Sequence, residues 1–559
     1  MSFFDDASLV MIPSGYKTSK VYSVKPTDGS GDLAFTRSNS TATRVGPDGL
    51  IEKVRTNLVL QSQTLDNASW DKSDATVTAN TTIAPDGTLT ADTITAVVID
   101  QRVNQAVTVA ASTEHTFSFF AKKGTTVTPR YSVYDLSNNA FILTQVDYSA
   151  LVNTSTWSRI TATFTTPAGC TSISIYPINA ATLGTTFIWG CQLETGVATP
   201  YIATTTAAVS VGPVANVPRL DYLNSSCPKL LLEPQRSNLA LNSESFDNAT
   251  WTKTNVTITA NNLISPDGTQ NADLANFTSG SNSINTGTTF AGNASVTISA
   301  FVKIGTISIF RIRESFYSGV SCVFDLSAQT TGAGGKIDNY GNGWYRCSFT
   351  YTLGVGQTNI NWIFDSNTAI GSLYLWGAQA EVGAYVTSYI PTLGASVTRG
   401  ADAASKTGVS GLLAATQGTI FMEVDFKYNN NPSPTSNDTR MWSAWDSSSS
   451  QVISLWARGD ALRYQFYNAV SGVNNEAAIT ATQGVHKVAM VYNGTNLKVY
   501  MDGALIVNAT MSASANLSLT AYGSGIFWTT PNQVHSTQLK QGLLFATALT
   551  DSQLAELTA

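Results

Sequence analysis

The sequence predicts an all-β protein made of several antiparallel sandwiches of jelly-roll type. Polar and apolar residues alternate in short runs, such as 116–119 (TFSF) and 297–301 (TISAF), as expected of strands with one buried face. Glycine, asparagine, aspartate and proline turns separate these runs, and helical periodicity is almost absent. A stretch of domain size is also present twice, which indicates repeated modules rather than one large core.

The duplication is read from landmarks that recur at a constant spacing. RTNL at 55–58 and LDNASW at 65–70 return as RSNL at 236–239 and FDNATW at 246–251, a displacement of 181 residues (236 − 55). WGCQLE and WGAQAE, which begin at Trp189 and Trp376, match at 187 residues (376 − 189) after small loop changes. Repetition of a module favours display or binding in tandem over a single catalytic centre.

Composition limits the classes of protein to consider. A chain of 559 residues is long enough for about three or four domains. Charged residues make up 12%, about half the usual share, and the net charge of −6 with scattered lysine and arginine argues against nucleic acid as a partner. A hydrophobic content of 43% argues against wholesale disorder.

The sequence favours neither membrane insertion nor classical secretion. No apolar stretch approaches the length needed to cross a bilayer, and residues 1–6 (MSFFDD) lack the basic and apolar regions of a secretory signal. Because the surface chemistry is typical of extracellular β-proteins, we expect release by another route, such as cell lysis together with a virus particle.

Residues 1–402 divide into four predicted parts. Residues 1–54 form an N-terminal arm or anchor, too thin to hold its own core and expected to dock on its neighbours. The first jelly-roll module spans 55–210, and an irregular linker with a small hairpin spans 211–235. The second jelly-roll module spans 236–402.

Residues 403–559 form a further predicted domain with strands at 420–426, 452–456 and 486–492. Asn493-Gly494 and Asp502-Gly503 are strong two-residue hairpin signals. The chain closes on an expected short helix, which Thr550 or Asp551 can cap.

The five cysteines carry little functional weight. Cys191 aligns with Ala378 and Cys347 with Ile160, so these positions accept small or apolar side chains and favour buried free thiols. The alternative is cross-strand bridging of Cys170–Cys191 or Cys322–Cys347, although neither pair recurs in the other module.

These residues carry a resemblance. Residues 403–559 resemble a laminin-G-like, concanavalin-A-type sandwich through the hairpins at 492–494 and 500–503 and the closing segment 548–554. The duplicated module is similar to carbohydrate-binding-module-like jelly rolls of bacteriophage virion proteins, through the motifs at 236–239, 388–392 (SYIPT) and 397–402 (VTRGAD). The first copy departs at 200–204 (PYIAT), where the Thr-Arg step is missing. The resemblance implies a fibre, spike or decoration role.

Sugar binding by β-sandwiches usually needs exposed aromatic rings, with amides and carboxylates for the hydroxyl groups. Three tryptophan pairs occupy matching positions in the two modules and are flanked by apolar residues, so we predict that they are core residues: Trp70/Trp251, Trp157/Trp344 and Trp189/Trp376. The candidate glycan-binding residues are therefore the C-terminal Trp442, Trp445, Trp456, Arg458 and Asp460.

A repeated acidic motif raises the question of calcium. Asp86 and Asp92 recur as Asp267 and Asp273 in Pro-Asp-Gly-Thr-x-x-Ala-Asp, and hard carboxylate oxygens suit a structural calcium ion. The competing interpretation is a turn in which the aspartate accepts hydrogen bonds from its own backbone. No other cofactor is indicated.

Catalysis is not expected. Glu423 and Asp425 lie two residues apart on one strand, as in family-sixteen-type glycosidases with a Glu-x-Asp-x-x-Glu strand. Lys427 and Tyr428 stand near the place of the missing second glutamate, so the retaining carboxylate pair is incomplete. The three histidines, His115, His486 and His535, show no metal-ligand spacing, and no nucleophile elbow or phosphate loop is present.

The sequence therefore predicts a non-enzymatic structural protein on the exterior of a phage virion, with a fibre- or spike-type role in adhesion to host surface glycans. Its expected partners are other virion proteins, host polysaccharide and further copies of itself, a trimer included. One alternative is a capsid or tail decoration protein with protein–protein contacts alone. A weaker alternative is a bacterial surface adhesin or glycosidase.

Overall fold

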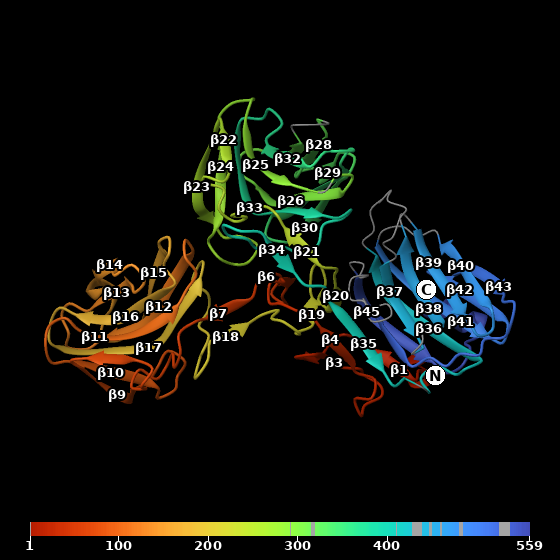
Figure 1. Cartoon of the computed structure of the whole chain (residues 1–559), viewed down its shortest axis with the longest axis horizontal. Helices are drawn as coiled ribbons and strands as arrows, with labels where there is room; N and C mark the ends of the chain where they lie inside the picture. The colour runs from red at the N-terminus through yellow and green to blue at the C-terminus, as the bar shows by residue number, and fades with distance from the viewer. Residues whose placement is uncertain are drawn as a thin grey trace. The chain divides into compact units, whose positions relative to one another are not determined.

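The structure is a computed structural model that describes residues 2–290, 292–314, 319–409, 411–426, 439–446, 450–458, 461–479, 484–524 and 537–559. It is nearly all β and consists of antiparallel sheets that pack as sandwiches, so the predicted fold class is confirmed (Figure 1). The chain forms two compact units, 54–212 and the combination of 1–53 with 213–559.

The unit 54–212 is one sandwich of two five-stranded sheets around its own apolar core. The first sheet has the order β9 (Ala75–Thr82), β10 (Ala91–Ala96), β17 (Gly184–Thr195), β12 (Glu114–Lys123) and β15 (Ser158–Thr165). The second has the order β8 (Asp71–Ser73), β11 (Gln101–Thr108), β16 (Ser172–Ala180), β13 (Arg130–Asp135) and β14 (Ala140–Asp147). A short ribbon joins β7 (Arg55–Asn57) to β18 (Val209–Val211), and η1 (Ser149–Leu151) is a 3-10 turn.

The second module repeats this strand order with an added edge strand on each sheet. Its first sheet has the order β23 (Val256–Leu263), β24 (Ala272–Phe277), β33 (Gly371–Val382), β26 (Ser295–Ile304), β31 (Trp344–Thr352) and β30 (Gly335–Asn339). The other has the order β22 (Thr252–Thr254), β25 (Ser283–Thr289), β32 (Asn359–Asp365), β27 (Ile309–Glu314), β28 (Ser321–Asp325) and β29 (Thr330–Thr331). The ribbon of β21 (Arg236–Asn238) and β34 (Val397–Arg399) closes it as β7 and β18 close the first module.

The same irregularity recurs in both modules and explains a repeated glycine. The pairing of β12 with β17 shifts between Ser118 and Phe120, and that of β26 with β33 shifts between Ser299 and Phe301. The partner strands carry Gly190 at φ +64° and Gly377 at φ +62°. A Cβ atom at Gly377 would lie 2.8 Å from the Phe301 ring, so a side chain is excluded there by both backbone conformation and space.

A third sandwich is assembled from three separated parts of the chain. Its eight-stranded sheet contains β1 (Leu9–Met11), β19 (Arg219–Asp221), β20 (Lys229–Leu232), β36 (Gln417–Phe426), β41 (Gly484–Asn493), β42 (Asn496–Met501), β43 (Ala504–Thr510) and β45 (Thr537–Phe545). Its nine-stranded sheet runs β2 (Tyr16–Lys17), β3 (Lys20–Val21), β4 (Leu33–Thr36), β35 (Ala403–Thr407), β44 (Ala521–Ser524), β37 (Thr439–Trp445), β38 (Gln451–Arg458), β39 (Ala461–Asn468) and β40 (Val473–Ile479). One core cluster includes apolar residues from 1–54, 211–235 and 403–559.

Several local predictions can be compared with this sandwich. The hairpin expected within 211–235 is formed by β19 and β20, and β20 pairs with β45. The Asp502-Gly503 turn is as predicted, whereas Asn493 pairs with Asn496, so the preceding loop consists of Gly494 and Thr495. The closing helix α2 (Asp551–Thr558) begins after Thr550, which forms a capping box with Gln553.

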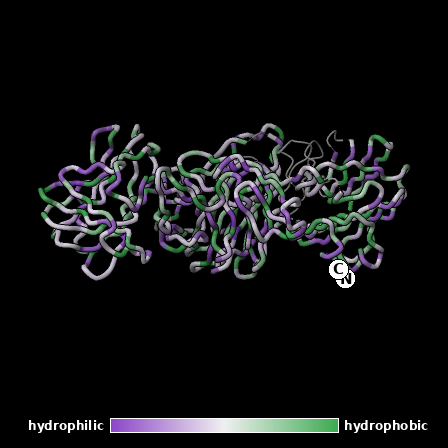
Figure 2. Tube along the Cα trace, turned by 90° about the horizontal axis from the view of Figure 1, so that it is seen from below, coloured by the Kyte–Doolittle hydropathy of each residue, from purple (hydrophilic) through white to green (hydrophobic). Residues whose placement is uncertain are grey.

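Hydrophobic and hydrophilic residues follow one another at short intervals along the coloured parts of the trace (Figure 2), as expected for strands that bury one face. Helix α1 (Phe3–Asp6) is a single turn, and the hairpin of β5 (Arg44–Val45) and β6 (Ile51–Glu52) stands apart from the large sheets. Among the described residues, no helix combines the length and the apolar character needed to cross a membrane.

Candidate functional site

An aromatic cluster lies on the β12–β17 sheet of the first module. Trp189 packs against Tyr201 with ring centroids 4.6 Å apart and against Phe120 at 5.5 Å, and Trp157 packs beside them. The indole Nε1 of Trp157 donates to the carbonyl oxygen of Ile83 at 2.9 Å. Trp189 is buried, whereas Phe120, Trp157 and Tyr201 are half-buried. We call these four aromatic residues the first aromatic face.

The prediction that the six paired tryptophans are core residues holds for five of them. Trp70 and Trp251 are each 1% exposed, and the remaining buried members are Trp189, Trp344 and Trp376. Trp157 differs, because it is half-buried and packs at the margin of its cluster.

The second module carries the same cluster in a covered form, the second aromatic face. Phe301, Trp344, Trp376 and Tyr389 occupy the matching positions, and none is more than 2% exposed. The hairpin β5–β6 contributes Val45 and Ile51 to the same apolar cluster. The backbone N–H of Ile51 donates to the carbonyl oxygen of Pro266 at 2.8 Å. A segment distant in sequence therefore covers the second aromatic face.

Lys53 follows this hairpin and lies between two acidic side chains. Its Nζ is 2.8 Å from Glu244 Oε1, 2.5 Å from Asp267 Oδ2 and 5.3 Å from the centroid of the Trp376 ring. Burial lowers the pKa of Lys53, but the carboxylates of Glu244 and Asp267 outweigh it and hold this pKa above its ordinary value. Burial raises the pKa of Glu244, which Lys53 opposes. The ammonium group therefore compensates two carboxylates that would otherwise be poorly solvated.

Replacing Lys53 with methionine is expected to destabilise the second module by about 1–2 kcal/mol. The two carboxylates would lose their shared cation, but the cost is limited because the Lys53 side chain is 20% exposed. Urea unfolding followed by tryptophan fluorescence measures the change. The double variant Lys53→Met with Glu244→Gln, which removes one orphaned charge, should recover part of the loss. Equal stability of Lys53→Met and the wild type would show that the ion pairs contribute nothing.

The Pro-Asp-Gly aspartates act in turns. Oδ1 of Asp86 accepts from the backbone N–H of Thr88 at 2.9 Å and from its hydroxyl at 2.6 Å. Asp267 Oδ1 accepts the same two bonds from Thr269. Both aspartates therefore form the turn that the sequence offered as the alternative to a calcium site, in which the carboxylate accepts a hydrogen bond from the nearby backbone.

The second pair of repeated aspartates joins strands to the preceding loop. Buried Asp92 accepts the backbone N–H groups of Leu65 at 2.8 Å and Asn80 at 3.0 Å. Asp273 accepts the matching groups of Phe246 and Asn261 at 2.7 and 3.0 Å. Since these oxygens face N–H donors, the donor set as folded does not fit a cation. Within the described residues, no group of three or more histidine, cysteine or acidic side chains could hold a metal ion.

Structural calcium stays a prediction that solution measurement can decide. The N–H donors around the four aspartates lead us to expect the same melting temperature in excess calcium and in excess EDTA. Differential scanning calorimetry of the full chain measures it. A rise of several degrees with calcium would revive a cation site, since a ligand that binds only the folded state raises apparent stability.

The buried carboxyl of Asp273 should make stability depend on pH. Burial raises its pKa from 3.8 to about 6, although the two backbone N–H bonds oppose this. The folded state then holds the proton more tightly than the unfolded chain, so the unfolding free energy falls as pH rises through about 4 to 6. Thermal unfolding at about pH 5 and pH 7 should show a larger loss for wild type than for Asp273→Asn. Parallel pH profiles would contradict this assignment.

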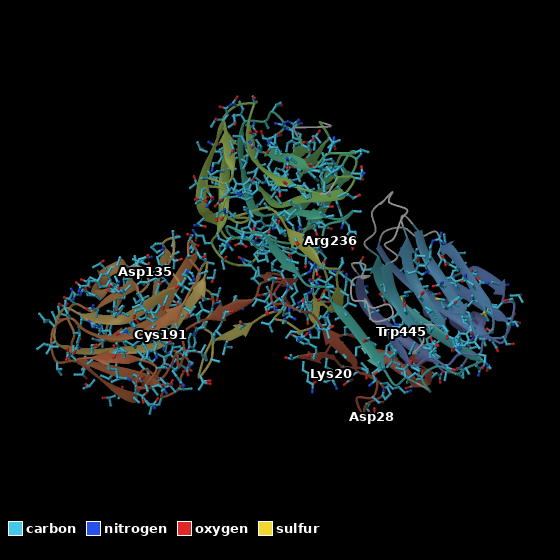
Figure 3. The ribbon with its side chains drawn as sticks, in the orientation of Figure 1. Lys20, Asp28, Asp135, Cys191, Arg236 and Trp445 are labelled. Carbon is cyan, nitrogen blue, oxygen red and sulfur yellow. The ribbon has the colours of Figure 1, made fainter. Side chains whose placement is uncertain are left out.

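The candidate glycan residues of the third sandwich are mostly internal. Trp442, Trp445 and Trp456 are 7%, 9% and 1% exposed, and Trp442 belongs to the main core. Trp445 is labelled in Figure 3. Asp460 lies outside the described residues, as does the side chain of Arg458. The structure therefore places no broad tryptophan face at these three positions, and sugar stacking there stays a prediction.

The acidic pair on β36 is engaged with basic side chains. Glu423 Oε1 lies 3.0 Å from Lys540 Nζ, and its other oxygen accepts from the Gln541 amide at 2.9 Å. Asp425 Oδ2 lies 3.0 Å from Lys229 Nζ. Lys427 and Tyr428, which stand near the place of a third carboxylate in the sequence, lie outside the described residues.

The histidines differ in what the structure shows. His115 is buried in the first module, His486 Nδ1 lies 2.6 Å from Asp502 Oδ2, and His535 lies outside the described residues.

The cysteines are free thiols, as favoured from the sequence. Cys170, Cys191, Cys322 and Cys347 are buried and Cys227 is exposed. Cys191 lies among the strands of the first module (Figure 3), and burial raises the pKa of its thiol well above the ordinary value. The four buried thiols therefore pack as small apolar groups.

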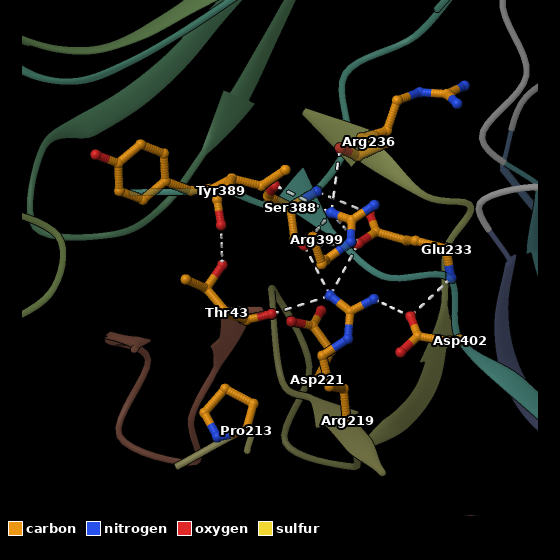
Figure 4. Close-up of polar contacts among 12 residues, drawn as sticks. Thr43, Pro213, Arg219, Asp221, Glu233, Arg236, Ser388, Tyr389, Arg399 and Asp402 are labelled. Carbon is orange, nitrogen blue, oxygen red and sulfur yellow. Dashed lines mark hydrogen bonds and ion pairs between the residues drawn. The ribbon is translucent and has the colours of Figure 1, made fainter. Parts of the chain in front are cut away.

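A buried ionic cluster contains residues of the third sandwich and residues from the end of the second module (Figure 4). Arg219 Nη1 donates to Glu233 Oε2 at 2.8 Å, and Arg219 Nη2 donates to Asp402. Arg37 Nη1 donates to Asp402 Oδ1 and Arg399 Nη1 lies near Glu233 Oε2, each at 3.0 Å. All five side chains are at most 3% exposed. We call them the ionic cluster.

Sequence reasoning did not identify the ionic cluster. Its acidic and basic residues lie in the arm, the linker and the end of the second module, which are far apart in the chain. A signal was present, since Arg399 and Asp402 belong to the VTRGAD motif and Glu233 follows three consecutive leucines. Polar residues that interrupt such apolar segments indicate buried pairs.

No family model and no curated protein match the chain. Among solved structures, the tandem CBM22-1–CBM22-2 domain of Paenibacillus barcinonensis Xyn10C is 10% identical, covering 58% of this chain and 98% of that one, with a TM-score of 0.24. The CBM40 of Ruminococcus gnavus IT-sialidase is 14% identical, covering 26% and 84%, with a TM-score of 0.23. The enzymatically active domain of bacteriophage CBA120 tailspike protein 4 is 18% identical, covering 25% and 21%, with a TM-score of 0.22. At these TM-scores the similarities carry no argument about function.

Proposed function

We propose that the protein is a non-enzymatic structural protein of a tailed bacteriophage virion, of fibre or spike type, that adheres to host surface glycans. The observation that carries the proposal is the duplicated sandwich, whose two copies share one strand order but present different surfaces. Individual sugar contacts are weak, and repetition along a chain and among several copies on a particle turns them into lasting attachment. A homo-oligomer, a trimer included, would serve this purpose.

The acidic pair supports adhesion rather than hydrolysis. A retaining glycosidase needs two carboxyl groups on either side of the scissile bond, one of them protonated. Glu423 and Asp425 instead bind lysine side chains from β45 and β20. Each carboxylate is thereby fixed as a structural ion-pair partner.

The virion assignment rests on the resemblance of the repeat motifs and on the low content of charged residues. Surfaces rich in hydroxyl and amide groups suit an extended protein outside the cell. The predicted location on the particle exterior follows from the same argument.

The test applies the full chain to immobilised bacterial surface polysaccharides, namely lipopolysaccharides, capsular polysaccharides and teichoic acids, and measures retention by biolayer interferometry. We expect binding to at least one of them, equally in the wild type and in Glu423→Gln. Antibody labelling of purified particles tests the location. Labelled particles without any polysaccharide binding would contradict adhesion and favour a decoration role. Absence of label from every particle would contradict the virion assignment.

A further inference from the structure

The two aromatic faces have matching sequences but differ in whether residues 44–53 lie over them. Pro266 and the Asp267 side chain are buried beneath residues 44–53, whereas Pro85 and Asp86 are exposed. A Cβ atom at Gly268 would lie 2.8 Å from Leu50, whereas nothing lies within 4 Å of the same position at Gly87. Among the described residues of the unit 54–212, no segment covers the first aromatic face as the hairpin covers its counterpart.

The residues around the first aromatic face also differ in charge. Gln63 stands at the position of Glu244 (244 − 181), so an amide replaces one of the two carboxylates that hold Lys53. The Tyr389 hydroxyl donates to Glu244 Oε1 at 3.1 Å, and Gln63 lies beside the Tyr201 hydroxyl. The exposed Asp86 carboxylate is solvated by water and does not require a cation as a partner. The first module therefore lacks the pair of carboxylates that holds Lys53 in the second module.

We propose that the first aromatic face binds a pyranose-containing saccharide, which takes the place that the β5–β6 hairpin fills on the second module. The half-buried rings of Phe120, Trp157 and Tyr201 offer apolar surface to the C–H face of a sugar ring. The exposed Asp86 carboxylate and the Thr88 hydroxyl, with the Gln63 amide, supply hydrogen-bonding groups for its hydroxyls. This assignment rests on the proposed function and locates its glycan site.

The lysine beside the face fits the same ligand. Lys122 Nζ lies 5.7 Å from the Trp157 ring centroid and 5.4 Å from that of Phe187. An ammonium group held over these rings can donate to sugar hydroxyls. Lys303 holds the matching position in the second module, which carries the hairpin, so this lysine does not by itself distinguish the two occupants. Among saccharides, the ammonium group favours a neutral or acidic one over a basic one.

The experiment uses the full chain with α- and β-linked hexasaccharides of glucose, mannose, galactose and N-acetylglucosamine, together with the immobilised polysaccharides named above. Trp157→Ala and Phe120→Ala should weaken binding about tenfold or more, because each removes a stacking ring. The matched control is Phe141→Ala, which removes a ring that is 46% exposed on β14 of the other sheet. That variant should bind like the wild type.

A second measurement leaves the protein unaltered, in case a variant fails to fold. Hydroxyl-radical footprinting of the wild-type chain should show several-fold less oxidation of Trp157 when the bound saccharide is present, with Phe141 unchanged. Protection of Trp157 supports the site independently of any substitution.

The outcomes separate the site from the function. Binding retained by both ring variants, or lost only in Phe141→Ala, overturns this site while adhesion stands. No saccharide bound by the wild type contradicts the proposed function itself. Protection of Trp157 by a synthetic peptide of residues 43–53, with no saccharide protecting it, overturns the assignment in favour of a protein partner.

Discussion

Replacing Asp402 with asparagine is expected to lower the unfolding free energy of the unit formed by 1–53 and 213–559 by about 3–5 kcal/mol. The carboxylate accepts from Arg37, Arg219 and the backbone N–H of Glu233. Its removal leaves three buried guanidinium groups with one acidic partner in the ionic cluster. The shape of the side chain is kept, so the loss reports charge compensation rather than packing.

Urea unfolding at pH 7 measures this effect, with Asp551→Asn as the control. Asp551 pairs with Lys498 in the same unit but is 61% exposed, so its loss should cost less than about 1 kcal/mol. Similar losses of unfolding free energy in Asp402→Asn and Asp551→Asn would show that the buried ionic cluster contributes no more to stability than an exposed ion pair.

The pH of this measurement matters because of Glu233. Burial raises the pKa of Glu233, but Arg399 and Arg219 outweigh burial and hold this pKa well below its ordinary value. The stabilisation from this carboxylate is therefore complete above pH about 4.5 and is lost as pH falls through the folded-state pKa.

Trp344→Ala is expected to destabilise the second module by about 3–5 kcal/mol, and Trp157→Ala to destabilise the first by about 1–2 kcal/mol. The two residues hold the same sequence position, and each indole donates to a backbone carbonyl, that of Ile264 or Ile83. The two indole rings differ in solvent exposure, since Trp344 is 2% exposed and Trp157 is half-buried. A cavity forms only where neighbours enclose the ring on every side.

Differential scanning calorimetry of the full chain measures the effect of each variant on its own module if the two modules unfold in separate transitions. The transition of the second module should move down by more degrees in Trp344→Ala than that of the first module does in Trp157→Ala. Equal shifts would mean that the two aromatic faces are covered alike, contrary to the structure.

Patterns within one module predicted most of the framework. Alternation, turn residues and the constant spacing of matching motifs indicated the strands and the repeated sandwich. The Pro-Asp-Gly turns at Asp86 and Asp267 also behave as their local chemistry requires. Such features depend on residues close in the chain, or on comparison of one copy with the other.

Contacts between distant segments could not be read in this way. The strand pairing of β1 with β45 and the ionic cluster each join residues hundreds of positions apart. The same limitation explains Trp157, because its sequence surroundings match those of Trp344 while the covering hairpin lies elsewhere in the chain. The sequence shows that the module is repeated, but it does not show which of the two aromatic faces the β5–β6 hairpin covers.

The most direct test of the account combines binding and turnover in one incubation of the full chain with the surface polysaccharide that it retains best. Bound protein and newly formed reducing ends are measured in the same sample over several hours. The account predicts saturable binding with no reducing ends above those of a protein-free control. Steady release of reducing ends that disappears in Glu423→Gln would show an enzyme and contradict a purely adhesive role.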